Sequence, residues 1–268
     1  MNKTCIEKKI EYKYGDTIKL KPFFDVHYGN TLCDIKAFKT YLNESDDKTY
    51  FFGGGDLLDS IVVTDKRYSK SMDKTETETI VDDQVSGLYD ILKPYKDRII
   101  SLGIGNHEYT IVKNCSTNPI KRLCEKLEVP YAGYSSFFKL SFSENGGRGR
   151  TVTFYYSHGY GGGSRTQGGN LTKFSKATTV FDADCYLFGH VHQLQYDSFP
   201  YLGIHGNKLV SKKKYICICG TFKKALAEDD TVTWEETKGF NPSYIGGLVV
   251  SMKPSKVWVD IKIRWIKS

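Results

Sequence analysis

The sequence lacks long apolar runs, low-complexity linkers and internal repeats. No stretch approaches the roughly 18 consecutive apolar residues of a membrane-spanning helix, so we expect neither a membrane span nor a membrane partner. The segment Met1–Tyr14 carries four lysines but not the apolar core of a secretory signal, which predicts a cytoplasmic protein. Without a repeat or a linker, the expected organisation is a single domain over residues 1–268.

Cysteines are scattered along the chain. The seven cysteines are an odd number, and one close pair, Cys217 and Cys219, is separated by a single residue. That spacing is not usual for a metal site. We therefore expect reduced and mostly buried thiols rather than a disulfide framework or a structural zinc site.

Acidic residues are missing between His205 and Lys224, a stretch that holds six lysines. The chain as a whole has a net charge of +7. A lysine run of this kind attracts phosphate-rich ligands through field steering and counterion release. It is equally typical of a solvated loop between strands, so both interpretations stay open.

Short apolar or β-branched runs predict the strands, and their order with the helices predicts a mixed α/β sandwich. The expected strands are Thr17–Phe24, Thr49–Phe52, Arg98–Ile104, Thr151–Tyr156, Cys185–Phe188, Tyr215–Cys219, Ile245–Met252 and Val257–Ile266. Helices are expected over Leu32–Asn43, Thr79–Leu92 and Pro119–Leu127, the last with Asn118 as its cap. The polar stretch Thr64–Asp83 is interpreted as a loop or lid.

A short polar motif follows directly on five of the expected strands. The motifs are Asp25–Val26–His27, Gly55–Asp56–Leu57–Leu58–Asp59, Gly105–Asn106–His107–Glu108, Ser157–His158–Gly159 and Gly189–His190–Val191–His192. Ligands of α/β sheets bind beyond the carboxyl ends of the strands, so five such motifs can share one site. Imidazole, carboxylate and amide groups suit divalent first-row metals. His205 is the one histidine outside the motifs and is interpreted as structural or as a loop residue.

The ordered set of motifs resembles the signature of the calcineurin-like metallophosphoesterase superfamily. That signature is Asp-x-His, Gly-Asp-x-x-Asp, Gly-Asn-His-Glu/Asp, His and Gly-His-x-His, and here it runs from Asp25 to His192. The glycine-rich run His158–Gly163 is similar to small phage and bacterial members. The resemblance implies a sandwich of two mixed β-sheets flanked by helices.

The same resemblance implies a role for each motif residue. Asp25, His27 and His192 would bind a first metal ion, and Asn106, His158 and His190 a second. Asp56 would bridge the two ions. His107 would face the substrate and protonate the leaving oxygen, while the Asp59 carboxylate orients it and Glu108 supports the loop. The cofactors would be two divalent ions, with manganese preferred and iron, zinc, nickel or magnesium as alternatives.

The expected activity is hydrolysis of phosphate esters, with a preference for phosphodiesters of nucleic acid or nucleotides, as in a nuclease. The lysine stretch, the likeness to small phage and bacterial members, and the nineteen tyrosines and fifteen phenylalanines, which can stack bases, favour this preference. A protein serine/threonine phosphatase is disfavoured because Ser60 stands where that branch has arginine. A phosphomonoesterase or nucleotidase and an inactive binding protein of the same fold remain alternatives, and the oligomeric state stays open. Candidate phosphate contacts are Lys66, Arg67, Tyr68 and Arg165.

Overall fold

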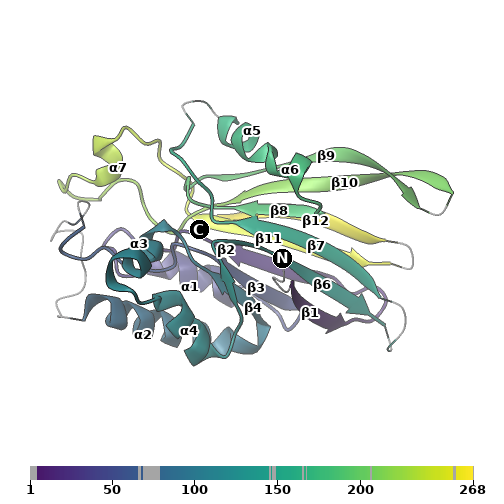
Figure 1. Cartoon of the computed structure of the whole chain (residues 1–268), viewed down its shortest axis with the longest axis horizontal. Coiled ribbons are helices and arrows are strands. Elements are labelled where there is room, and N and C mark those ends of the chain that lie inside the picture. Colours follow the sequence, from purple (N-terminus) through teal and green to yellow (C-terminus); the bar gives the residue numbers. More distant parts are fainter. Residues whose placement is uncertain are drawn as a thin grey trace.

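A computed structural model describes residues 5–65, 68, 79–144, 146, 149–164, 166, 168–205, 207–255 and 258–267. These residues form two six-stranded sheets packed face to face with helices on the outer sides (Figure 1). Both sheets mix parallel and antiparallel pairs. The expected sandwich of two mixed sheets flanked by helices is therefore confirmed.

The first sheet holds the strands that lead to the two later histidine motifs. Its order is β1 (Ile6–Glu11), β6 (Ser135–Ser143), β7 (Arg150–Ser157), β8 (Cys185–Phe188), β10 (Lys208–Cys219) and β9 (Leu194–His205). Strands β7, β8 and β10 are parallel, and β9 and β10 form a long antiparallel hairpin at the edge. Figure 1 shows this hairpin reaching beyond the ends of the other strands.

The second sheet holds the strands that lead to the three earlier motifs. Its order is β12 (Val259–Lys267), β11 (Gly246–Pro254), β2 (Ile18–Phe23), β3 (Thr49–Gly54), β4 (Ile99–Gly103) and β5 (Tyr131–Gly133). Strands β2 to β5 are parallel, so their carboxyl ends meet at one edge of the sheet. Strand β12 alternates between half-buried and exposed residues over most of its length, as its sequence predicts.

Helices cover the outer faces of both sheets (Figure 1). The second sheet packs against α1 (Ile35–Asn43), α2 (Ile80–Leu92) and α4 (Pro119–Leu127), with a 3₁₀ turn at Lys93–Arg98. The first sheet packs against α5 (Gly169–Ser175) and α6 (Ala177–Val180). Local signals explain where helices start: Asp34 Oδ1 accepts from Ala37 N at 2.9 Å, and Asn118 Oδ1 accepts from Lys121 N at 3.0 Å.

An apolar core between the two sheets holds the strands in register. Phe52 and Phe138 stack across it with ring centroids 4.6 Å apart, and Phe138 stacks on Phe154 at 4.7 Å. The cysteines match the expectation of free and mostly buried thiols, because only Cys5 and Cys115 are exposed. None of the helices in the described part of the chain has the length and apolar character needed to cross a bilayer.

Several elements differ from the sequence-based expectation. The lysine-rich stretch is not a solvated loop, because Lys208–Cys219 forms strand β10. Strands β1, β5, β6 and β9 and helices α3 (Asn106–Cys115), α5, α6 and α7 (Trp234–Thr237) were not predicted. Their polar alternation or short length hides the hydrophobic period on which the prediction depends. Most of the predicted lid Thr64–Asp83 lies outside the described residues.

Candidate metal centre

The five polar motifs meet at one end of the sandwich. Each follows the carboxyl end of a strand: β2 for Asp25, β3 for Asp56, β4 for Asn106, β7 for His158 and β8 for His190, and the motif after β4 forms the first turn of α3. Main-chain hydrogen bonds tie these loops together, since Asp25 N donates to Gly55 O at 3.1 Å and His27 N donates to Asp56 O at 3.0 Å. The shared site that the motifs predict is therefore present in the fold.

Several of the predicted ligand residues adopt a backbone conformation that side chains rarely take. The φ angles are +49° at Asp25, +51° at His27, +49° at Asp56, +71° at His190 and +54° at His192. A residue other than glycine in this left-handed region carries strain, which persists where the surrounding structure holds it for function. Such strain at five positions of one site indicates that the loops are shaped to direct these side chains inward.

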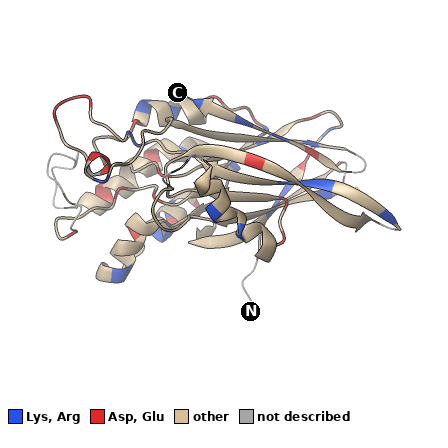
Figure 2. Cartoon of the chain, turned by 90° about the horizontal axis from the view of Figure 1, so that it is seen from above, with Lys and Arg blue, Asp and Glu red and all other residues tan. Residues whose placement is uncertain are grey.

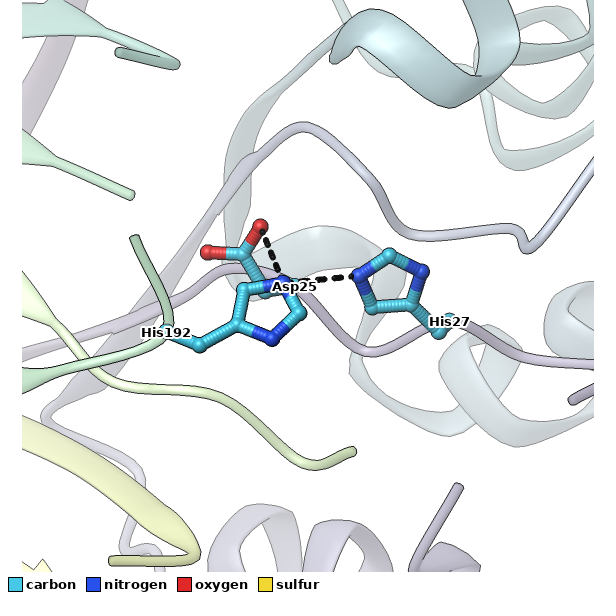
Figure 3. Close-up of side chains that lie close together, drawn as sticks. All are labelled: Asp25, His27 and His192. Atoms are coloured by element: carbon cyan, nitrogen blue, oxygen red, sulfur yellow. Dashed lines mark hydrogen bonds and ion pairs between the residues drawn. The ribbon is translucent and has the colours of Figure 1, made fainter. Parts of the chain in front are cut away.

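Asp25, His27 and His192 form a first group of converging ligand atoms (Figure 3). Nε2 of His27 lies 3.1 Å from Nε2 of His192, which lies 3.6 Å from Oδ1 of Asp25. Asp25 is fully buried, and its Oδ1 has no hydrogen-bond partner among the described residues, whereas Oδ2 accepts from His190 N at 2.8 Å. An unpartnered buried carboxylate oxygen beside two imidazole nitrogens fits a divalent cation.

Asp56, Asn106, His158 and His190 form the second group. Oδ2 of Asp56 lies 3.3 Å from Nε2 of His158, and Oδ1 of Asn106 lies 3.2 Å from Nε2 of His158 and 2.7 Å from Nδ1 of His190. Nδ1 of His158 lies 3.0 Å from the carbonyl of Gly54, to which it donates, so Nε2 is the nitrogen directed at the site. This donor set of nitrogen and oxygen also suits a divalent first-row metal.

Burial and the charges of neighbouring side chains shift the pKa values of Asp25, Asp56 and His158 in different directions. Burial raises the pKa of Asp25 well above its usual value. Burial also acts to raise the pKa of Asp56, but the charges of His158 and His107 outweigh it and lower that pKa well below normal. Burial acts against charge on His158, yet Asp56 raises its pKa to about 9. The metal-free site therefore keeps a proton on His158 that a cation would displace.

The other three predicted histidine ligands, His27, His190 and His192, are held neutral by their surroundings. Burial lowers the pKa of His27 and of His192 well below the usual range, and it lowers the pKa of His190 to about 4. Neutral imidazole is the form that binds a metal ion. Three of the four predicted histidine ligands are thus ready for a cation at neutral pH.

His107 lies beside the two groups, at the start of α3, and Asp59 contacts it differently from the expected way. Nδ1 of His107 donates to the main-chain oxygen of Asp59 at 2.6 Å. The Asp59 carboxylate is 3.7 Å from that nitrogen and closer to Nδ1 of His27, at 3.3 Å. The same residue therefore serves two histidines, its carbonyl orienting His107 and its carboxylate supporting His27.

Asn30 and Glu108 support the site by hydrogen bonds to its motif residues. Asn30 Nδ2 donates to Asp59 Oδ2 at 3.2 Å, a contact that was not predicted although Asn30 follows the first motif closely. The fully buried carboxylate of Glu108 accepts from the main-chain nitrogens of Asp56 (3.1 Å), Leu57 (2.6 Å), Leu58 (2.9 Å) and Gly105 (2.9 Å). Glu108 thus supports the loop, as expected, by joining two motifs.

A cavity of about 820 Å³ opens over the two groups of converging side chains. Its walls include the glycine run Gly161–Gly163 and parts of the segment 225–243 near α7. Within it, Lys223 Nζ pairs with Glu235 Oε1 at 2.6 Å, and both side chains are buried. In the sequence Lys223 stands out only as part of a lysine run, because its partner lies twelve residues away in a segment without a motif.

The remaining candidates fall in different places. Tyr68 lines the cavity, while Lys66, Arg67 and Arg165 lie outside the described residues. His205 is the last residue of β9.

No protein-family model matches the chain, and no curated protein matches it. The chain is similar to solved structures at low identity. One is a metallophosphoesterase from Sphaerobacter thermophilus, with 10% identity, a TM-score of 0.40, and coverage of 94% of this chain and 89% of that one. Another is a predicted phosphoesterase from Streptococcus pneumoniae, with 12% identity, a TM-score of 0.33, and coverage of 94% and 90%. A third is Vacuolar Protein Sorting 29 from Cryptosporidium parvum, with 12% identity, a TM-score of 0.37, and coverage of 94% and 99%. Likeness at this level does not identify an activity.

Proposed function

We propose that the chain is a dinuclear metal-dependent phosphoesterase that prefers phosphodiesters of nucleotides or nucleic acid. One observation carries the class of reaction: two adjoining groups of buried carboxylate, amide and imidazole ligands open into a single large cavity. Asp25 Oδ1 has no hydrogen-bond partner among the described residues, and the imidazoles of His27 and His192 beside it are neutral. Bound cations would supply the positive charge that this buried oxygen lacks. The expected single domain over residues 1–268 is part of the same proposal.

Asp25, His27 and His192 would hold one ion, and Asn106, His158 and His190 the other, with Asp56 between them. When bound, two divalent ions supply an activated water molecule and offset the charge of the phosphoryl group. Asp59 would keep His27 oriented through the 3.3 Å contact to its Nδ1. Manganese is the proposed metal, because nitrogen and oxygen ligands without thiolate accept it.

His107 would deliver the proton to the leaving oxygen. A carbonyl can only accept, so the 2.6 Å bond to the Asp59 carbonyl requires that Nδ1 of His107 carries its proton. Nε2 is then the nitrogen that can hold and release a second proton, and His107 lines the cavity where the leaving group would lie. The contact with Asp59 positions the ring for this transfer without reacting itself.

The cavity supports a substrate larger than a simple phosphate monoester. Its volume of about 820 Å³ falls in the range of pockets that enclose drug-sized ligands. Phe240 is half exposed at its wall and offers a surface on which a base can stack. Lys223 adds a cation at the side of His27 and His192, where it would contact an oxygen of the phosphodiester.

The test is a substrate panel with chelator-treated protein reconstituted with manganese, iron, zinc, nickel or magnesium. We expect manganese-dependent hydrolysis of bis-nitrophenyl phosphate, faster than that of the mono-ester, and cleavage of DNA, RNA or cyclic nucleotides. Faster turnover of the mono-ester would instead identify a phosphomonoesterase. Metal binding without turnover of any ester would leave the inactive binding protein and refute the proposal.

A further inference from the structure

The far end of the sandwich carries an apolar surface that the proposed phosphoesterase chemistry does not use. Strand β10 is parallel to β8, whose carboxyl end leads to the metal centre, so the β9–β10 turn lies at the opposite end. With twelve residues in each strand, the hairpin is about 40 Å long. Its free end is therefore remote from the reacting groups.

This surface arises because one side of the hairpin continues the interior face of the sandwich past the end of the second sheet. Tyr215 and Cys217 pack on that side against the core, and Tyr215 Oη donates to Ile261 O of β12 at 2.9 Å. Because side chains alternate along a strand, Leu209 points to the same side as Tyr215. Leu209 lies six residues outward from Tyr215, and its exposure shows that the described strands of the second sheet do not cover it.

The side chains on this overhang are exposed although they are apolar. Leu202 is 63% exposed, Leu209 72% and Ile204, which pairs with Leu209 across the hairpin, 81%. Trp258, 68% exposed, precedes β12 at the same end, because β11 is antiparallel to β2 and so ends away from the metal centre. We call Leu202, Ile204 and Leu209 the distal apolar patch.

Lysines flank the distal apolar patch on β10: Lys213 points to the same side as Leu209, whereas Lys208 and Lys212 point to the opposite side. Lys208, Lys212 and Lys213 are exposed near the free end, and the sequence from Ser198 to Ala227 contains no aspartate or glutamate. Figure 2 shows blue segments toward the free end of the hairpin. Exposed aliphatic side chains flanked by lysine are typical of a surface that enters the headgroup region of an anionic bilayer.

We propose that the distal apolar patch docks on an anionic lipid surface, with its three side chains in the headgroup region and the neighbouring lysines on the lipid charges. A second copy of the chain fits less well, because an association through this end would bring the same lysines together. Nucleic acid also fits less well, because the most exposed side chains here are aliphatic rather than aromatic or guanidinium groups. This departs from the sequence-based expectation of no membrane partner.

The geometry makes the hairpin an anchor and not a route for substrate. A span of about 40 Å exceeds the depth to which an interfacial segment enters a bilayer, so the metal centre would stay in water while the patch is docked. Vesicle binding and ester hydrolysis are therefore separable properties. Failure of one says nothing about the other.

The test is co-sedimentation of the full chain with vesicles of phosphatidylcholine mixed with phosphatidylserine, and with pure phosphatidylcholine. We expect binding to the mixed vesicles, weakened by added salt, and little binding to the neutral ones. The double variant Lys212→Gln/Lys213→Gln should bind roughly 30-fold more weakly, from about 1 kcal/mol for each lysine. The double variant Ile204→Ser/Leu209→Ser should lose roughly tenfold or more.

Matched controls carry the same chemical changes elsewhere. Lys36→Gln/Lys39→Gln removes two exposed lysines from α1, and Val180→Ser removes an exposed aliphatic side chain from α6. Both should bind vesicles like the parent chain, and all variants should keep their thermal unfolding temperature. Equal binding to both vesicle types, or binding unchanged in the hairpin variants, would overturn the proposal. The proposal would also be overturned if the parent chain does not bind vesicles but self-associates in light scattering or binds DNA in a gel shift, and the hairpin variants abolish that association or binding.

Discussion

Glu108 Oε2 accepts a hydrogen bond from the main-chain nitrogen of Asp56 over 3.1 Å, and both residues are buried. The contact joins the loop after β3 to the start of α3, fifty-two residues away in the chain. Burial, followed by the charge of Asp56, raises the pKa of Glu108 to about 7. Burying this carboxyl group costs free energy, and its hydrogen bonds hold the loop that carries Asp56 in place.

Replacing Glu108 should therefore destabilise the fold more than an ordinary surface change. Glu108→Ala leaves four main-chain N–H groups without their acceptor, each costing about 1 kcal/mol or more. We expect a loss of at least about 4 kcal/mol in the free energy of unfolding, measured by urea denaturation of the metal-free protein. The free energy of unfolding of Glu108→Gln should lie between those of the parent chain and Glu108→Ala, because its amide keeps one acceptor oxygen. An unchanged midpoint for Glu108→Ala would contradict the supporting role.

Asp56 and His107 should separate metal binding from catalysis. Asp56→Asn removes the carboxylate charge between the two ligand groups, so metal content and activity should fall together. His107→Ala should keep both metals, measured by elemental analysis, while hydrolysis of an alkyl phosphodiester slows roughly 10²–10⁴-fold. The penalty for His107→Ala should shrink with a nitrophenyl leaving group, which needs little protonation. Equal metal loss in the two variants, or the same penalty for all leaving groups, would refute the assigned roles.

Metal binding should release a proton near neutral pH. The pKa of His158 is about 9 in the metal-free protein, raised above its usual value by Asp56 against the effect of burial. The ring is therefore protonated at pH 7 and must lose that proton to bind a cation, so metal affinity should rise with pH up to about 9. The same pairing stabilises the metal-free fold fully below pH 6.5, the ordinary histidine value, and this stabilisation is lost as pH rises through 9.

Calorimetric titration with manganese in buffers of different ionisation enthalpy measures this proton release. His190→Ala is a matched control, because burial lowers the pKa of His190 to about 4 and its ring carries no proton to release at pH 7. That variant should bind metal more weakly yet release the same number of protons. A binding enthalpy that is independent of the buffer would argue against a protonated His158.

Lys223 should act on substrate binding more than on metal binding. Lys223→Met removes the cation that pairs with Glu235 at 2.6 Å in the cavity wall. Glu235→Gln keeps the lysine and weakens only its partner. We expect Lys223→Met to raise KM for a phosphodiester roughly tenfold, about the value of one charge-assisted hydrogen bond, with metal content unchanged. Lys223→Met also leaves the buried Glu235 carboxylate without its partner and should lower stability. The double variant Lys223→Met/Glu235→Gln should regain that stability but keep the raised KM. If it regains both, Lys223 has only a structural role.

The sequence by itself determined the residues of the candidate site and much of the secondary structure. Helix Pro119–Leu127 and strand Cys185–Phe188 have the predicted bounds, because a cap with a proline and a continuous apolar run are local signals. The motifs at the strand ends named the residues that converge, since parallel strands bring their carboxyl ends together.

Only the tertiary structure decided the contacts between distant segments. The Asp59 carbonyl, not its carboxylate, binds His107, and Glu235 pairs with Lys223, because backbone direction and loop packing set these contacts. Most of the lysine-rich stretch forms strand β10 of a hairpin, and the apolar side chains near the free end of that hairpin are exposed. The local sequence predicts which face of a strand each side chain takes. Whether that face is buried depends on whether another layer of the fold covers it.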